Sequence, residues 1–450
     1  LQGDVTYQQM KITTALVCSS LPLAVMLLVT ELIRQVVSAL GSPSAHQTRF
    51  LLVVKSILLR FNHLCVVWVG LITATWFWPV VLSRQGKPYS LAMVLAAWLL
   101  WFVIKKSWWR VGVLLTLSSF AQMSAIGSWL IVGLLQPLAL LVAVPLSWPL
   151  FKQWAVERTL TNADSHLGQK LGLTMSVQDR LEIYLRNLWL NFRSIWWQGD
   201  AVLYQNIPHT AHLDVISGGL VLAGMVLVIM ILWSKPRLWR TLGIVLWGLV
   251  VLQVPAMLDV FASNTPNAGR LAVWVPLLAC LAGFGMILVT TLLQLYWQHS
   301  RYCHRLIVCL WLVSGLLIIG LNLYSYFNTY RMLLPNHNQQ VSLRIVDFLQ
   351  SHLYGKTVLV HHCCWHQSSQ PQPWIIGLEI TPERRFTQIN EQLDVDNWLG
   401  HQCRASRDAF LVINPDLSTL PSWQDKVKLE KMAAPELNGF GPVAAIYYLP

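Results

Sequence analysis

The sequence predicts a polytopic α-helical membrane protein that ends in an α/β domain. Its 450 residues are 55% hydrophobic and only 12% charged, and the mean hydropathy is +0.51. This composition is too apolar for an ordinary soluble protein. Several apolar stretches reach the roughly 18 residues that a membrane helix needs, and they lack the period-two alternation of β-barrel strands.

About ten membrane helices are expected, and the last four are the clearest. The expected helices between residues 47 and 124 are short, so some of them could merge or re-enter the membrane. The ten segments are 11–33, 47–61, 66–83, 91–104, 110–124, 128–149, 214–233, 239–259, 270–295 and 304–326. They assign residues 1–330 to the membrane domain.

The positive charge lies in the membrane part. Residues 1–330 hold 22 Lys and Arg against 9 Asp and Glu, whereas residues 331–450 hold 10 against 11. This excess predicts contact with anionic membrane lipids, and the chain has no basic run or motif that predicts a nucleic-acid partner.

Short basic loops predict the orientation. The loops 234–240 and 299–305 are rich in Lys and Arg, so the positive-inside rule places them in the cytoplasm. Residues 151–213, residues 260–269 and the tail then lie on the extracytoplasmic face. The same count leaves the basic segment 105–110 outside, which breaks the rule and suggests a miscounted helix before residue 124.

The extracytoplasmic segment 151–213 contains an amphipathic helix over residues 176–197. Its apolar positions follow i, i+3, i+4 spacing, and its polar side carries three arginines. The apolar positions are Leu181, Tyr184, Leu185, Leu188, Trp189 and Phe192, and the arginines are Arg180, Arg186 and Arg193. We expect the helix to lie along the outer membrane surface; the alternative is a helix packed on the tail domain.

The tail, residues 331–450, is expected to be a soluble α/β domain. A helix is predicted over 339–353, and strands over 357–363, 373–380, 409–415 and 444–450. The stretch HHCCWH at 361–366 has zinc-ligand residue types. Neighbouring strand residues point to opposite faces, however, and no second ligand pair follows at zinc spacing. A strand end is therefore favoured over a metal site, and a disulfide there stays open.

A polar loop precedes the helix expected at 214–233. It contains Asp200, His209, His212 and Asp214. Asp214 directly precedes the helix and is predicted to cap it. The two histidines are candidates for a metal or phosphate contact, although His-x2-His alone is a weak signal.

The stretch SNTPNAGRLAVWVP at 263–276 supplies the candidate anion site. Arg270 is expected to begin the helix 270–295 on the outer face, where free N–H groups and the helix dipole attract anions. The Arg fork suits phosphate oxygens. Asn264 and Asn267 lie beside it in sequence. A snorkelling interfacial arginine is the equally weighted alternative.

The order of these motifs resembles that of GT-C fold membrane glycosyltransferases of the protein O-mannosyltransferase and aminoarabinose-transferase superfamily, which are family 39-like. The motifs are the "GD…P…LD…G…L…G" loop and helix, the basic turn, a helix ending near Asp259, and "S-N-T-P-N-A-G-R…P". "FNHLCVVW" at 61–68 is similar to a short element before that family's next helix. The resemblance covers roughly residues 1–330 and rests on motif order.

The resemblance implies an enzyme that moves a sugar from a polyprenyl-phosphate carrier to an acceptor on the extracytoplasmic face of a bacterial inner or plasma membrane. Arg270, Asn267 and Asn264 would hold the donor phosphate. The loop contacts would come from Asp200, His209, His212 and Asp214. The implied partners are the donor lipid, membrane lipids and partner membrane subunits. No definite cofactor follows, and a divalent cation stays open.

One departure from the family concerns the catalytic acid. The family carries an acidic pair after its first membrane helix, and this sequence has none there; Asp4 is the one carboxylate before its first expected helix. No signal peptide is visible, and the chain is expected to begin inside a longer protein. The catalytic loop therefore lies upstream of Leu1, or Asp4 is its remnant, or catalysis is lost.

Two other functions compete with the transferase. The missing acidic pair favours a non-catalytic membrane subunit of a larger complex. A transporter or flippase is less favoured, because few charges fall within the expected helices, Lys55 and Glu31 being the main cases.

Overall fold

The computed structural model divides the chain into two units, residues 11–329 and residues 1–10 with 330–450. Each unit is described by itself. The described residues are 7–41, 49–83, 88–121, 126–157, 172–200, 206–207, 209–260, 265–297, 302–330, 337–352, 356–361, 373–380, 385–389, 409–413, 430–433, 436–437, 441–442 and 444–449.

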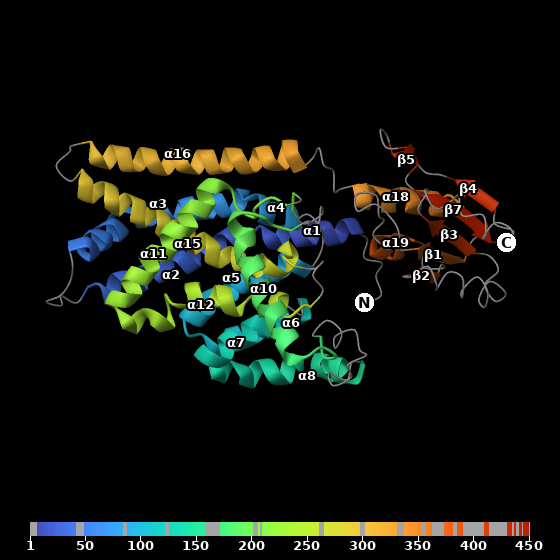
Figure 1. Cartoon of the computed structure of the whole chain (residues 1–450), viewed down its shortest axis with the longest axis horizontal. Helices are drawn as coiled ribbons and strands as arrows, with labels where there is room; N and C mark the ends of the chain where they lie inside the picture. The colour runs from blue at the N-terminus through green and yellow to red at the C-terminus, as the bar shows by residue number, and fades with distance from the viewer. Residues whose placement is uncertain are drawn as a thin grey trace. The chain divides into compact units, whose positions relative to one another are not determined.

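Helices make up the described part of the first unit (Figure 1). They are α1 (Tyr7–Cys18), α2 (Leu21–Ala39), α3 (Arg49–Thr75), α4 (Phe77–Ser83), α5 (Pro88–Ile104), α6 (Trp108–Ala121), α7 (Ile126–Leu135), η2 (Pro137–Ala139), α8 (Leu140–Glu157), α10 (Val177–Trp196), α11 (Val215–Ser234), η3 (Pro236–Arg240), α12 (Ile244–Val251), α13 (Val254–Met257), α14 (Ala268–Leu271), η5 (Ala272–Trp274), α15 (Val275–Tyr296), α16 (Cys303–Tyr324) and η6 (Ser325–Tyr330).

Among the described residues, six helical stretches are long and apolar enough to cross a membrane, so the chain is an integral, polytopic helical membrane protein. They are Gln9–Ala39, Arg49–Thr75, Val215–Ser234, Pro236–Met257, Ala268–Tyr296 and Cys303–Tyr330. Two further apolar helices, Tyr89–Ile104 and Pro137–Leu150, are shorter. Six of the roughly ten expected crossings thus meet the length criterion.

Several of the expected helices are joined or divided in the structure. The segments 47–61 and 66–83 are joined, because α3 runs unbroken through 27 residues, a length of about 40 Å. The expected helix 128–149 is divided into α7 and α8 at Gln136, just before Pro137, whose ring cannot continue a helix. Two expected helices thus merge into one before residue 105, and one expected helix splits into two after residue 105.

Contacts between distant segments identify one end of the bundle. The Trp76 indole donates to Ser217 Oγ at the start of α11 (3.0 Å), and the Trp78 indole donates to the carbonyl of Ala268 at the start of α14 (3.1 Å). Asn322 in the last turns of α16 accepts from the N–H of Phe77 (2.8 Å). Thus α3 and α16 end where α11 and α14 begin. We call this end, which carries Asp200, Asp214 and Asp259, the carboxylate end.

The opposite end of the bundle is basic. It holds the turns after α11 and α15, with Lys235, Arg237, Arg240 and Arg305. Lys105 lies toward this end as well, because its Nζ is 2.8 Å from Glu31, in the half of α2 that leads to the turn before α3. The expected count that placed 105–110 with the extracytoplasmic segments is therefore corrected, and the joined helix α3 explains the error.

Glycines allow the two most closely packed helices, α11 and α15, to touch backbone to backbone. A Cβ on Gly224 would lie 1.8 Å from the carbonyl oxygen of Leu281, and one on Gly285 would lie 1.9 Å from that of Leu220. Small residues permit this approach between membrane helices, where apolar burial adds little. The contact fixes where α11 begins relative to the segment before α15.

The second unit holds a five-stranded mixed sheet in the order β2-β1-β3-β7-β4. The pairs β1–β2 and β1–β3 are parallel, and β3–β7 and β4–β7 are antiparallel. Its elements are α18 (His337–Gln350), β1 (Thr357–His361), α19 (Pro373–Glu379), β2 (Arg385–Ile389), β3 (Ala409–Ile413), β4 (Glu430–Ala433), β5 (Glu436–Leu437), β6 (Gly441–Pro442) and β7 (Ala445–Leu449).

Most of the elements expected in the tail are present. The helix 339–353 and the strands 357–363, 409–415 and 444–450 correspond to α18, β1, β3 and β7. The strand expected at 373–380 is wrong: it forms helix α19, whose Ile376 packs with α18 and the sheet in one apolar core. Short apolar runs carry no periodicity that separates strand from helix. His361 ends β1, and the rest of HHCCWH lies outside the described residues.

Candidate functional site

The candidate site at the carboxylate end begins with the loop before α11. This loop folds back on itself, since the N–H of Gly199 donates to the carbonyl of Thr210 (2.9 Å) and that of His209 to the carbonyl of Asp200 (3.2 Å). Asp200 is buried, and its Oδ2 accepts a hydrogen bond from the N–H of Ala268 (3.0 Å). Asp200 therefore ties this loop to the first residue of α14.

The sequence predicts that Arg270 begins the long helix 270–295, but in the structure it does not. It lies in α14, a four-residue helix that Asn267 caps by accepting from the N–H of Arg270 (3.0 Å), and α15 begins only at Val275. Because Asn267 is the N-cap, the helix begins at Ala268, two residues before Arg270. The N–H of Ala268 already donates to Asp200. One of the helix-start amides expected to face a phosphate, the N–H of Ala268, thus binds a carboxylate of the chain itself.

Arg270 pairs with Asp259. Its Nη1 lies 2.5 Å from Asp259 Oδ2, and the side chains are 20% and 3% exposed respectively. Asn187 of α10 donates to the backbone carbonyls of Met257 (3.0 Å) and Asp259 (2.6 Å). Asn187 therefore fixes the backbone of the Asp259 segment, while the Arg270 side chain stays 20% exposed.

His212 is buried against Trp78. Their rings stack at 4.6 Å with an interplanar angle of 18°, and His212 is 2% exposed. Neither ring nitrogen has a hydrogen-bond partner within the described part of the chain. Burial lowers the pKa of His212 from 6.5 to about 3, so the imidazole is neutral at physiological pH. His209, three residues before His212, is exposed and has a backbone φ of 59°.

Asp214 caps α11, as expected. Its Oδ1 accepts from the N–H groups of Ile216 (3.1 Å) and Ser217 (2.9 Å). Its Oδ2 accepts from the hydroxyl of Ser217 (2.6 Å) and from the Asn322 amide (2.8 Å). Asp214 thereby joins the start of α11 to the end of α16, and its contacts are those of a structural residue.

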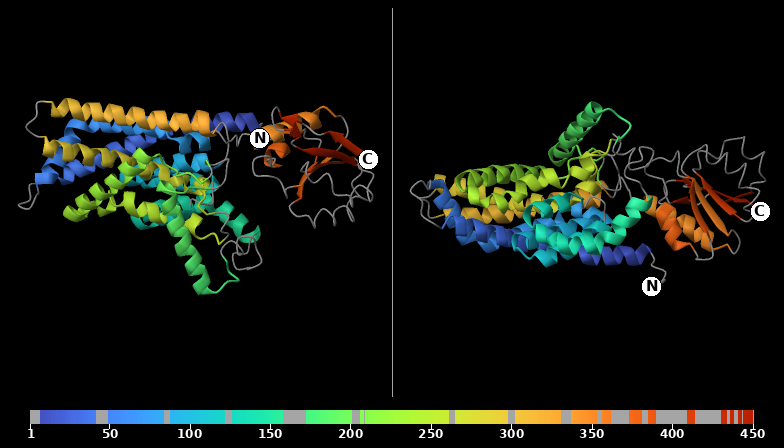
Figure 2. Two further views of the ribbon diagram at one scale, coloured as in Figure 1. Left: turned by 45° about the horizontal axis from the view of Figure 1, so that its top comes forward. Right: turned by 90° about the horizontal axis from the view of Figure 1, so that it is seen from below.

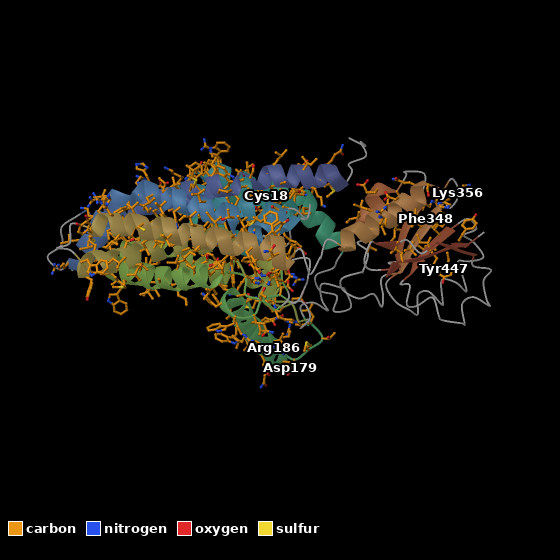
Figure 3. All side chains as sticks on the ribbon, turned by 90° about the horizontal axis from the view of Figure 1, so that it is seen from above. Cys18, Asp179, Arg186, Phe348, Lys356 and Tyr447 are labelled. Atoms are coloured by element: carbon orange, nitrogen blue, oxygen red, sulfur yellow. The ribbon has the colours of Figure 1, made fainter. Side chains whose placement is uncertain are left out.

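The amphipathic helix forms as α10, with Ser176 as its N-cap. Figure 2 shows that α10 stands out from the bundle, and Figure 3 places Asp179 and Arg186 on its outer part. Its inner half packs on α11 and α13, where the Trp196 indole donates to the carbonyl of Gly218 (2.9 Å). The apolar stripe is exposed at Val177, Leu181, Leu185 and Trp189.

The structure thus gathers four of the expected site residues, Asp200, His212, Asn267 and Arg270, around the start of α14. Asp4 and Asn264 lie outside the described residues. Sequence reasoning missed Asp259, Asn187 and Trp78 as members of this cluster. The signal that could have found Asp259 is a lone carboxylate at the end of an apolar helix, eleven residues before the lone Arg270.

The comparisons with known proteins leave the family open: no family model matches the sequence, no curated protein matches it, and no solved structure matches it.

Proposed function

We propose that the protein is a glycosyltransferase that moves a sugar from a polyprenyl-phosphate carrier to an acceptor on the extracytoplasmic face of a bacterial plasma membrane. The proposal includes a GT-C-like body over residues 1–330, in which the shorter helices α5 to α8 supply the remaining crossings. It also places the domain 331–450 outside the cytoplasm, because α16 ends at the carboxylate end and the opposite end is basic.

The observation that carries the proposal is the accessible Arg270 at the end of an apolar bundle. A guanidinium has five N–H donors in a planar fork, and the pairing with Asp259 engages one edge of it. The accessible remainder suits a phosphate at headgroup depth, while apolar surfaces of neighbouring helices suit the polyprenyl chain. Asp259 holds the guanidinium in place and reduces the cost of keeping a cation there.

The proposed reaction needs one bond made and one broken. The acceptor hydroxyl oxygen attacks C1 of the sugar, the bond from C1 to the phosphate oxygen breaks, and polyprenyl phosphate leaves with the electron pair. The acceptor proton passes to a carboxylate base. Arg270 stabilises the charge on the departing phosphate.

The test measures transfer from polyprenyl-phosphate hexose in proteoliposomes. Arg270→Ala should lower the rate by at least a hundredfold, Arg270→Lys should retain a measurable part of it, and Arg237→Ala at the exposed basic end should leave it unchanged. Equal rates for Arg270→Ala and the wild type would remove Arg270 from the mechanism. Because Arg270→Ala removes the cationic partner of Asp259 and should destabilise the protein, each variant is first checked to remain folded in detergent at the assay temperature, and the double variant Asp259→Asn/Arg270→Gln serves where Arg270→Ala unfolds.

A non-catalytic subunit of a larger membrane complex is the second candidate. The observation that favours it is the structural use of all three described carboxylates at this end: Asp200 binds a backbone amide, Asp214 caps α11 and Asp259 pairs with Arg270. This candidate predicts that the protein purifies in a larger assembly and that no polyprenyl-phosphate carrier binds to it.

A further inference from the structure

The inner face of α10 buries three polar residues next to the apolar Ile195. Asn187, Asn191 and Ser194 follow one another at i, i+4 and i+7 on one face of the helix, and each is 0% exposed. Leu181 and Leu185, on the apolar stripe, are both 56% exposed. A surface helix ordinarily turns its apolar stripe inward, whereas α10 leaves part of that stripe exposed and buries these polar groups together with Ile195. The arrangement places amide groups against the candidate site.

Backbone contacts locate Asn191 within that face. One turn before it, Asn187 binds the carbonyls of Met257 and Asp259. One turn after it, the carbonyl of Ser194 accepts from the N–H of His212 (2.9 Å). Asn191 is thus flanked on one side by the segment that contains Asp259, the partner of Arg270, and on the other by the segment that contains His212.

Asn191 and His212 share a property that the buried Gln253 also has. Within the described residues, neither amide atom of Asn191 and neither ring nitrogen of His212 has a hydrogen-bond partner, although both side chains are buried. Buried polar groups in proteins are almost always paired, because leaving them unpaired costs their full desolvation. Asn191 lies one turn before Ser194, whose carbonyl binds the His212 backbone, so the two side chains point to a place where an external molecule completes the hydrogen bonds.

The chemistry of these four atoms restricts the occupant. The Asn191 amide offers a donor and an acceptor, and a neutral imidazole also offers one of each. The set carries no charge, so it suits hydroxyl groups, which donate and accept together, better than a carboxylate or a phosphate. An apolar chain would leave all four atoms unpaired.

We propose that Asn191 and His212 form a subsite for the hydroxyl groups of the transferred sugar, beside the Arg270–Asp259 pair that faces its phosphate. The inference rests on the proposed function. It adds the two residues that let the protein bind the glycosylated carrier in preference to polyprenyl phosphate alone.

The test compares two probes on the full chain in lipid nanodiscs: polyprenyl phosphate and polyprenyl-phosphate hexose. The wild type should bind the glycosylated carrier at least tenfold more tightly than the bare one. Asn191→Leu and His212→Phe keep side-chain size without hydrogen-bonding groups, and they lie on separate elements. Each should bind the bare carrier as the wild type does and lose the preference for the sugar. Gln178→Leu on the exposed part of α10 should keep the preference.

The outcomes separate this inference from the function on which it rests. If Asn191→Leu and His212→Phe keep the preference, ordered water occupies the place and the subsite is overturned. Equal binding of both carriers by the wild type would also overturn the subsite, and it would support the phosphate contact without a sugar contact. If the wild type binds neither carrier, the proposed function and the subsite fall together.

Discussion

Asp259 and Arg270 form an ion pair of 2.5 Å that joins the end of α13 to the short helix α14. The Asp259 side chain is 3% exposed, so the pair is largely shielded from solvent on the carboxylate side. The relationship connects stability with the proposed phosphate contact, because the same guanidinium serves both.

Removing one member of the pair should destabilise the protein more than removing both charges. Arg270→Ala removes the cationic partner of a buried carboxylate and should lower the free energy of unfolding by about 3 kcal/mol. The double variant Asp259→Asn/Arg270→Gln leaves no buried charge and should lose less than half of that. Thermal and denaturant unfolding in detergent micelles measures both; equal losses would show that the pair is not coupled in this way.

Gly224 and Gly219 lie on the same helix and should respond oppositely to alanine. A Cβ at Gly224 would meet the Leu281 carbonyl at 1.8 Å, so α11 and α15 must separate, at about 3 kcal/mol or more. Nothing lies within 4 Å of a Cβ at Gly219, and Gly219→Ala should be neutral or gain up to about 1 kcal/mol. Unfolding midpoints in micelles compare the two; similar midpoints would contradict the close backbone contact.

Loss of the Asp214 side chain should loosen the start of α11. Asp214→Ala removes a helix cap, a change that costs about 1–2 kcal/mol, and it also leaves the buried Asn322 amide without this acceptor. Asp214→Asn retains a capping oxygen and should recover most of the loss. Hydrogen exchange of the first turn of α11 reports the effect directly, and unchanged protection in Asp214→Ala would show that the cap is dispensable.

Stability should fall in acid because of His212. Its pKa in the folded protein is about 3, below the ordinary 6.5, so between these values the unfolded chain binds a proton that the folded chain does not. Above pH 6.5 both states are neutral and the effect vanishes. Below it, stability decreases by up to about 1.4 kcal/mol per pH unit.

His212→Phe keeps the contact with Trp78 and should flatten this pH dependence of the unfolding midpoint between pH 6.5 and 4.5. The matched variant His209→Asn, at an exposed position whose positive φ Asn tolerates, should keep the wild-type dependence. A wild-type slope in His212→Phe would assign the acid sensitivity to another group.

The two sides of α10 should differ in their contact with lipid. Spin labels at Leu185→Cys and at Arg186→Cys lie on neighbouring exposed positions, one on the apolar stripe and one on the polar side. If α10 lies at the membrane surface, the label at 185 should be shielded from a water-soluble nickel relaxant and accessible to oxygen, and the label at 186 should show the reverse. Equal access to nickel at both positions would remove the membrane contact.

Local sequence features predicted much of the fold. The amphipathic period predicted α10, a carboxylate before an apolar run predicted the Asp214 cap, and the strand candidates around 357, 409 and 444 form β1, β3 and β7. These features depend on residues within one or two turns of each other. The errors at 373–380 and in the helix count before residue 124 occur where apolar runs have no period or flanking signal.

The sequence by itself determined that the chain is an integral membrane protein of apolar helices with a basic excess, because composition and period are properties of short segments. The tertiary structure alone decided which polar residues meet: Asp259 with Arg270, Asp200 with Ala268, and Asn191 between the segments of Asp259 and His212. These partners are separated by up to 68 residues, and only the packing of α3, α10, α11 and α14 brings them to one end of the bundle. Burial then sets their chemistry, because pairing and desolvation depend on neighbours that no local pattern specifies.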